Sequence, residues 1–198
     1  MVKKYNVAIA GATGAVGREF LNILEERNFP IDKLYLLASE NSKGKKILFN
    51  NKEYFVEELS KFDFKKVHLS LFSPGGSVSA EFAPKAAQEG SLVIDNTSFF
   101  RMKDDVPLIV PEVNADVLEN FFENKNRSNI IANPNCSTIQ MVVALKPLHD
   151  EAIINRIVVS TYQAVSGAGK TAMDELFNQT QNIYLNKSIE KNKFTKQI

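Results

Sequence analysis

Residues 5–17 read YNVAIAGATGAVG and carry the strongest indication of the fold. The apolar run that ends at Gly11 is typical of a strand covered on both faces. Gly11, Gly14 and Gly17 then lead into residues 18–27, where apolar residues recur at helical spacing. Such glycines allow a tight turn, close approach of the backbone to a pyrophosphate, and close packing of the helix on the sheet. We therefore predict a dinucleotide-binding unit, with a purely structural turn as the alternative.

The rest of the first 135 residues continues the pattern of strands and helices. Apolar runs at 33–38, 67–72 and 92–95 predict further strands, and residues 78–89 predict a helix that ends at Gly90. Two short runs at 47–49 and 54–56 look like a hairpin, and 108–110 like a short edge strand. This order predicts an α/β protein with a Rossmann-like, doubly wound, mostly parallel sheet. Small-residue turns such as 73–77 should line a ligand crevice at the carboxyl ends of the strands.

Composition limits the other functional classes. The 198 residues are 44% hydrophobic and 24% charged with a formal net charge of +1, which is ordinary for a globular protein and implies no nucleic-acid partner. No signal peptide and no apolar run long enough for a bilayer is seen, so we expect a cytoplasmic protein that does not contact a membrane. The two histidines and the single cysteine lack metal-ligand spacing, so we expect no metal site.

The segment after the second predicted strand bears on the choice of nicotinamide cofactor. The polar side chains of Ser39, Asn41 and Ser42, with Lys43 behind them, suit the 2′-phosphate of NADP. Glu40 is the opposing feature, because an acidic residue at this place usually binds the ribose hydroxyls of NAD. If Glu40 points at the ribose the cofactor is NAD, and if it points to solvent the cofactor is NADP. On balance the sequence favours NADP.

Cys136 is the only cysteine of the chain and follows a turn at Pro134. The apolar run from Ile139 to Leu145 predicts a mostly buried helix, with Ser137 or Thr138 as its N-cap. A thiol at a helix N-terminus is stabilised as the nucleophilic thiolate, because the unpaired amides and the helix dipole favour negative charge. The alternative is a small buried apolar residue without chemistry.

Two further segments carry candidate polar groups. Arg101 closes the polar stretch after the strand at 92–95 and is either a planar fork for phosphate or carboxylate, or a surface residue. Residues 157–161 predict a β-branched strand, followed by a glycine-containing loop at 162–169 that can approach a nicotinamide. Residues 171–185 predict a helix with one apolar side.

Five motifs together resemble the bacterial form of aspartate-semialdehyde dehydrogenase, in its N-terminal portion. They lie in order along the chain at residues 11–17, 96–101, 110–114, 133–140 and 160–169. The resemblance implies an NADP-binding domain over 1–135 and the beginning of an α+β catalytic and dimerisation domain over 136–198 that is cut short. It implies NADPH-dependent reduction of 4-aspartyl phosphate to aspartate 4-semialdehyde and phosphate, in the biosynthesis of lysine, threonine and methionine through diaminopimelate. Family members are homodimers.

The resemblance also implies roles for individual residues. Cys136 would form the acyl thioester, Arg101 would bind phosphate, Gln163 would contact substrate and Asn135 would help to position the thiol. The residues implied at the cofactor are Gly11, Thr13, Gly14, Ala15, Val16, Ser39, Asn41, Ser42, Ser166 and Gly167. Asn41 departs from the family pattern, which often has arginine there to pair with the 2′-phosphate, so the departure weakens the case for NADP.

Members of that family continue well beyond 198 residues and supply there a histidine acid/base and an arginine for the substrate carboxylate. We therefore expect the 198-residue chain to be an incomplete sequence that is inactive by itself. Two alternatives stay open at this point. One is N-acetyl-glutamyl-phosphate reductase, which shares the thioester chemistry, and the other is a noncatalytic NADP-binding fragment.

Overall fold

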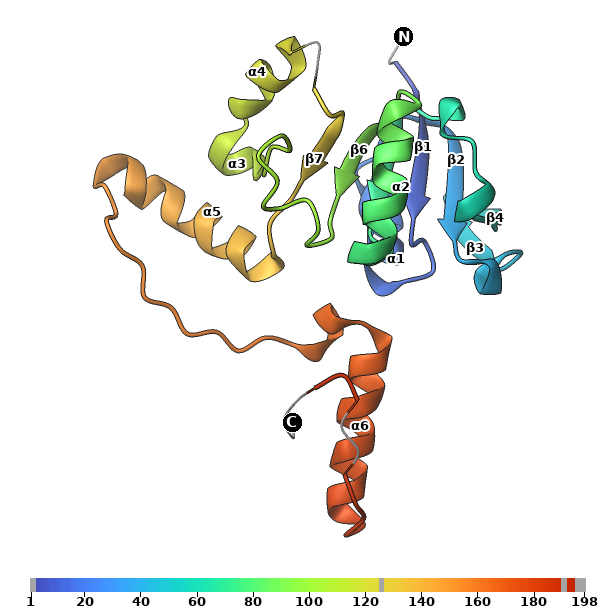
Figure 1. The fold of residues 1–198 in the computed structure, drawn as a ribbon, viewed down its shortest axis with the longest axis vertical. Helices are drawn as coiled ribbons and strands as arrows, with labels where there is room; N and C mark the ends of the chain where they lie inside the picture. Colours follow the sequence, from blue (N-terminus) through green and yellow to red (C-terminus); the bar gives the residue numbers. More distant parts are fainter. Residues whose placement is uncertain (1–2, 125–126, 190–191, 195–198) are drawn as a thin grey trace. The chain divides into compact units, whose positions relative to one another are not determined.

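A computed structural model describes residues 3–124, 127–189 and 192–194 (Figure 1). Contacts divide the chain into a first unit, Met1–Ile154, and a second unit, Asn155–Ile198. The boundary predicted between residues 135 and 136 stays a prediction; it coincides with the start of helix α5 (Cys136–Glu151). In the described part of the chain, no helix is both long and apolar enough to cross a membrane.

The first unit is built on one sheet. Within the described residues seven strands pair in the order β3-β4-β2-β1-β5-β6-β7, and all neighbours are parallel except the hairpin of β3 and β4. The strands are β1 (Tyr5–Ala10), β2 (Ile31–Ala38), β3 (Lys46–Phe49), β4 (Lys52–Glu58), β5 (Leu69–Phe72), β6 (Leu92–Asp95) and β7 (Ile130–Ala132). The predicted doubly wound, mostly parallel sheet is confirmed. The predicted edge strand at 108–110 is reduced to a parallel bridge from Leu108 to Ala132.

Helices cover both faces of this sheet. The first unit contains α1 (Ala15–Glu26), α2 (Gly76–Gln88), α3 (Pro111–Asn114), α4 (Val117–Glu123) and α5, with short 3-10 turns η1 (Glu40–Ser42), η2 (Leu59–Lys61) and η3 (Phe64–Lys66). Alternate residues of β1 enter two separate cores: Val7 and Ile9 pack with Leu21 of α1, whereas Ala8 and Ala10 pack with Ala83 of α2. Because the two faces of β1 are both covered, its last four residues, the apolar run 7–10, are fully buried, as predicted.

The strand order reverses at β1. The chain moves from β1 to β2 on one side and then returns to place β5 on the other side. Ligands of open α/β sheets bind in the crevice that such a reversal leaves at the carboxyl ends of the strands. The turns that follow β1 and β5 therefore form its two walls.

Two glycines in and after the turn that follows β1 are required by close packing, and the first is also required by its backbone conformation. Gly11 has φ +85°, and a Cβ there would lie 2.7 Å from the carbonyl oxygen of Ser73 in the turn after β5. A Cβ on Gly17 would lie 2.2 Å from the carbonyl oxygen of Gly11. These two glycines let α1 and the turn after β5 approach β1 closely.

The second unit corrects one prediction. Residues 157–161 are exposed, and they form no strand among the described residues. Their β-branched side chains favour an extended backbone, yet a strand also needs a neighbour to take its N–H and C=O groups. None of the described strands pairs with this segment, so the predicted strand is wrong.

The remaining elements of the second unit are η4 (Val165–Ala168) and α6 (Lys170–Tyr184), which matches the predicted helix within a residue. The buried side of α6 is partly polar, because it includes Glu175. The carboxylate of Glu175 accepts hydrogen bonds from the backbone N–H groups of Asn192, Lys193 and Phe194. Burial opposes ionisation of Glu175, but these backbone donors outweigh it and hold the pKa of the carboxyl below its ordinary value. Phe177 on the apolar side is 69% exposed.

We predict that Gly17→Ala lowers the free energy of unfolding by about 1–3 kcal/mol, because the added methyl group collides with the backbone of Gly11. Gly76→Ala is the control: it also lies in a helix, and its added Cβ would meet its nearest atoms at 3.9 Å. Urea unfolding of both variants measures the difference. Equal stability of the two variants would contradict the close-packing role of Gly17.

Candidate functional site

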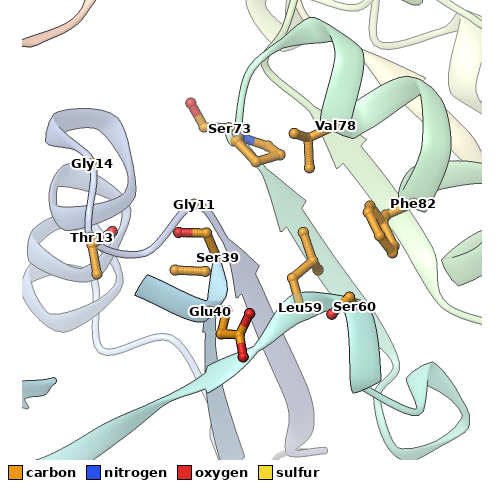
Figure 2. A pocket seen from close by; sticks show the side chains of 12 residues that line it. Gly11, Thr13, Gly14, Ser39, Glu40, Leu59, Ser60, Ser73, Val78 and Phe82 are labelled. Carbon is orange, nitrogen blue, oxygen red and sulfur yellow. The ribbon is translucent and has the colours of Figure 1, made fainter. Parts of the chain in front are cut away.

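A cavity of about 460 Å³ opens at the carboxyl ends of the central strands (Figure 2). The turns after β1, β2 and β5 line it, together with η2 and α2, through Gly11, Thr13, Gly14, Ala38, Ser39, Glu40, Leu59, Ser60, Ser73, Pro74, Val78 and Phe82. Its volume lies within the usual range for a site that binds a small molecule or cofactor. The prediction that the turns after β1 and β5 line a crevice is confirmed.

One wall of the cavity suits a pyrophosphate. Helix α1 begins at Ala15, and its N-cap residue Gly14 offers no side-chain acceptor to the amides of the first turn. Unpaired amides at a helix N-terminus bind anions, and the helix dipole adds to the attraction. Thr13 and Gly14 line the cavity directly, whereas Ala15 and Val16 lie next to them in the exposed first turn of α1. The residues present therefore fit a dinucleotide.

The residues predicted to bind the adenosine phosphate divide into two groups. Ser39 lines the cavity, and so does Glu40. Asn41 and Ser42 are not among the lining residues, and Ser42 is buried with its hydroxyl accepting a hydrogen bond from Lys45 Nζ at 3.2 Å. The preference for NADP stays a prediction.

A second group of polar residues follows β6 and β7. The Arg101 guanidinium donates from Nε to the carbonyl oxygen of Asn133 at 2.9 Å and from Nη2 to that of Asn96 at 3.0 Å. Asn133 Nδ2 also donates to Asn96 Oδ1 at 2.6 Å. Arg101 is half-buried and held by both strand ends, so the simple surface alternative does not describe it.

Beneath this group lies a buried carboxylate that sequence reasoning did not single out. Asp95 has no exposed surface and accepts hydrogen bonds from Ser79 of α2 and from Thr97, each at 2.7 Å. Its backbone oxygen accepts the N–H of Asn133 at 3.2 Å. A buried, fully bonded carboxylate of this kind holds its neighbours in one arrangement, which here includes the segment that carries Arg101.

Cys136 is the first residue of α5 and is exposed. The predicted cap is wrong: Asn135 is the N-cap, and its Oδ1 accepts from the Ser137 amide at 3.0 Å and the Ser137 hydroxyl at 2.6 Å. The Cys136 thiol points to the same oxygen, with Sγ at 3.8 Å. An asparagine at this position caps well because its side-chain oxygen reaches back to the N2 amide.

The exposure of the thiol bears on one of the two interpretations of Cys136, and its role as nucleophile stays a prediction. An exposed sulfur is not a buried apolar residue, so that alternative is excluded. The helix itself is not mostly buried, contrary to the prediction, since none of its residues is fully covered. Asn133, whose carbonyl oxygen holds Arg101, stands three residues before Cys136, so the guanidinium borders the turn that bears the thiol.

The predicted residues of the second unit lie in one loop. Gln163 precedes η4, and Ser166 and Gly167 lie within it. Gly169 ends this turn with φ +88° and becomes the N-cap residue of α6. All of these residues belong to the second unit.

Sequence reasoning missed several residues that line the cavity. Leu59 and Ser60 belong to η2, which directly follows β4, and Val78 and Phe82 belong to α2. The position of Ser60 after a strand could have indicated that it lines the cavity, because the carboxyl ends of parallel strands lie at one edge of the sheet. The contribution of Phe82 from within a helix had no comparable indication in the sequence.

Comparison with known proteins agrees with this geometry. Residues 6–121 match the family model of the semialdehyde dehydrogenase NAD binding domain, and residues 145–198 match that of the semialdehyde dehydrogenase dimerisation domain. The chain belongs to the semialdehyde dehydrogenase family. The predicted resemblance is thereby confirmed, as is a fold with a nucleotide-binding domain followed by the start of a second domain.

Individual members of the family are also similar to this chain. The chain is 55% identical over all 198 residues to aspartate-semialdehyde dehydrogenase 2 of Vibrio cholerae, covering 58% of that protein. It is 60% identical over 178 residues to aspartate-semialdehyde dehydrogenase of Aquifex aeolicus, covering 89% of this chain and 51% of that protein. A crystal structure of the Vibrio cholerae aspartate semialdehyde dehydrogenase II complexed with ASA superposes with a TM-score of 0.91 at 53% identity, over 100% of this chain and 57% of that one. The chain thus spans somewhat over half the length of these relatives.

We predict that Asn135→Ala lowers the free energy of unfolding by about 1 kcal/mol, because the Ser137 amide in the first turn of α5 loses its acceptor. Asn135→Asp keeps an oxygen in the same place and should retain most of the stability. Chemical denaturation of both variants tests this expectation. An alanine variant as stable as the aspartate variant would show that the cap contributes nothing.

Proposed function

We propose that the intact gene product converts 4-aspartyl phosphate to aspartate 4-semialdehyde and phosphate, with NADPH as reductant. The observation that carries this proposal is the exposed thiol of Cys136 at the N-terminus of α5, next to the turn that holds Arg101. The relatives named aspartate-semialdehyde dehydrogenase support the choice of reaction, and the complex of one relative with ASA supports a small-molecule substrate.

The thiolate of Cys136 attacks the acyl carbon of 4-aspartyl phosphate, the bond from that carbon to the phosphate oxygen breaks, and a thioester forms as phosphate leaves. When bound, a reduced nicotinamide would supply the hydride for reduction of this thioester. The thiohemiacetal alkoxide on Cys136 would then collapse to the aldehyde and return the sulfur as thiolate. The positive end of the α5 helix dipole would favour the negative charge that develops next to Cys136.

Arg101 suits the phosphate in this scheme. Its guanidinium has five N–H donors in a fixed fork, and the bonds to Asn133 and Asn96 orient that fork before any ligand arrives. Orientation by backbone carbonyls reduces the entropy lost when the phosphate binds. We assign Arg101 to binding the phosphoryl group and Asn135 to positioning the thiol.

The cofactor site of the proposal is the cavity at the glycine turn. Thr13, Gly14 and the first turn of α1 would hold the pyrophosphate, and Ser39 would face the adenosine ribose. By resemblance, Gln163 would contact substrate, and Ser166 with Gly167 would complete the nicotinamide end. The same resemblance supports a cytoplasmic homodimer that serves lysine, threonine and methionine biosynthesis, and a 198-residue chain that does not turn over by itself.

We predict that Cys136→Ser reduces cofactor reduction by at least about a thousandfold, because an alcohol is a far weaker nucleophile than a thiolate at neutral pH. The assay incubates the full-length gene product with aspartate semialdehyde, phosphate and NADP or NAD, and follows absorbance of the reduced nicotinamide. Thr138→Ser, also in the exposed first turn of α5, is the matched control and should retain activity.

Four outcomes would count against parts of the proposal. Retention of activity by Cys136→Ser would show that the reaction does not pass through a thioester on Cys136. Activity only with N-acetylglutamate semialdehyde would favour the related reductase. Absence of any cofactor reduction by the full-length protein, with its thiol inert to labelling, would leave a noncatalytic nucleotide-binding protein. Full activity of the 198 residues alone would contradict the expected need for a longer chain.

We predict that Arg101→Lys raises the KM for phosphate about tenfold while kcat changes less, because a lysine cannot make the bidentate contact. Steady-state kinetics in the phosphorylating direction separate the two constants. The KM for the cofactor should be unaffected. An unchanged KM for phosphate would show that Arg101 does not bind the phosphate.

A further inference from the structure

We propose that Asp95 is a positioning residue for phosphate binding, because its buried carboxylate fixes the segment that carries Arg101. The inference rests on the proposed function, in which the Arg101 guanidinium binds the phosphoryl group. It goes further in making the phosphate affinity depend on a side chain with no exposed surface, which a ligand cannot touch.

Asp95 is a costly residue for the interior of the sheet. It ends strand β6, and a buried carboxylate costs free energy unless hydrogen bonds replace the water that it loses. Among the described residues no lysine, arginine or histidine forms an ion pair with Asp95, so hydroxyl donors provide this compensation. Buried charge contributes little to stability in itself. Its presence here therefore favours a role in holding one arrangement of the chain.

The two carboxylate oxygens of Asp95 hold two different elements. Oδ1 accepts the hydroxyl of Ser79 in α2, and Oδ2 accepts the hydroxyl of Thr97, which belongs to the arginine segment (residues 96–101). The Thr97 oxygen in turn accepts the backbone N–H of Phe99 at 3.4 Å. Ser79 and Thr97 are both buried, so water competes little for these bonds. The carboxylate thus fixes the start of the arginine segment against a helix.

The carbonyl groups that accept from Arg101 stand next to these bonds. Arg101 Nη2 donates to the carbonyl oxygen of Asn96. Asn96 lies between Asp95 and Thr97, so their side-chain hydrogen bond spans this carbonyl group and limits its rotation. The other acceptor, the carbonyl oxygen of Asn133, belongs to a residue whose amide donates to the backbone oxygen of Asp95. Both carbonyl groups that orient the guanidinium are therefore held through Asp95.

Loss of the bond between Asp95 and Thr97 should lower the fraction of molecules in which the guanidinium is oriented. The apparent affinity for phosphate falls in proportion to that fraction, because only the oriented form binds well. Once phosphate is bound, the guanidinium is oriented again, and kcat changes little. A merely structural role would lower the stability of the fold without changing the KM for phosphate.

The same sheet contains a buried hydrogen bond that serves as a control. Ser70 of β5 and Ser91, just before β6, have no exposed surface, and their hydroxyl oxygens lie 2.8 Å apart. In the described part of the chain, neither hydroxyl bonds to the arginine segment. Ser70→Ala therefore removes a buried hydroxyl bond and leaves the support of Arg101 in place.

The test compares steady-state kinetics of the full-length gene product in the phosphorylating direction. Thr97→Val removes the hydroxyl at nearly constant shape and should raise the KM for phosphate about fivefold, with kcat within about twofold of wild type. Asp95→Asn should act in the same direction, and Thr97→Ser should retain the wild-type KM because it keeps the hydroxyl. Ser70→Ala should leave the KM for phosphate unchanged.

A double variant tests whether Thr97 acts through Arg101. In an Arg101→Lys background the guanidinium is absent, so Thr97→Val should raise the KM for phosphate by less than about twofold further. Additive effects of the two substitutions would show that the arginine segment acts on phosphate by another route, and would overturn the inference.

A KM for phosphate that is unchanged in Thr97→Val, or raised equally in Ser70→Ala, would also overturn the inference. Thermal unfolding establishes that the variants are folded, and Thr97→Val decides the question if Asp95→Asn is not. A KM raised in Arg101→Lys but in none of the Asp95 and Thr97 variants would refute the inference and leave the proposed function standing. If the wild-type protein does not reduce the cofactor, the proposed function fails, and calorimetric titration with inorganic phosphate compares the same variants without turnover.

Discussion

Parallel pairing of β1 with β2 on one side and β5 on the other is the constraint from which the cofactor cavity follows. Ala10 pairs with Leu37 and with Phe72, so the chain leaves all three strands at one edge of the sheet. The Gly11 amide donates to Leu37 O at 2.8 Å, and the Ser73 amide donates to Ala10 O at 2.9 Å. These bonds extend the ladders into the turns and keep the cavity walls in register.

The same principle builds the second polar group at β6 and β7. Asp95 pairs with Ala132, and Asn133, the residue after the end of β7, donates its amide to Asp95 O. Arg101 then bonds to the carbonyl groups of Asn96 and Asn133, one beyond each strand. The guanidinium thus joins two turns that lie 37 residues apart along the chain, as the Asn133 to Asn96 bond also does. Polar groups held in this way are oriented before a ligand arrives, which lowers the entropic cost of binding it.

Local sequence patterns predicted which segments form helices better than they predicted where a helix begins or which strands pair. The helix expected at 171–185 is present as α6, because helical periodicity and propensity act within the segment itself. The strand expected at 157–161 is absent among the described residues, because a strand also depends on a neighbour that the pattern does not specify. The N-cap of α5 is Asn135 and not Ser137 or Thr138. All three nearby polar residues could cap a helix, and only the exact start of the helix selects among them.

The sequence alone determined the order of strands and helices up to residue 95, the glycine turn after the first strand, and the single thiol after Pro134. These are local properties, set by the spacing of apolar residues and by the allowed conformations of glycine and proline. Only the tertiary structure decided that Glu40 and not Asn41 lines the cavity, and that two carbonyl groups hold Arg101. The reason is that side-chain direction and long-range hydrogen bonds depend on which strands become neighbours, and residues far apart in the chain settle that pairing.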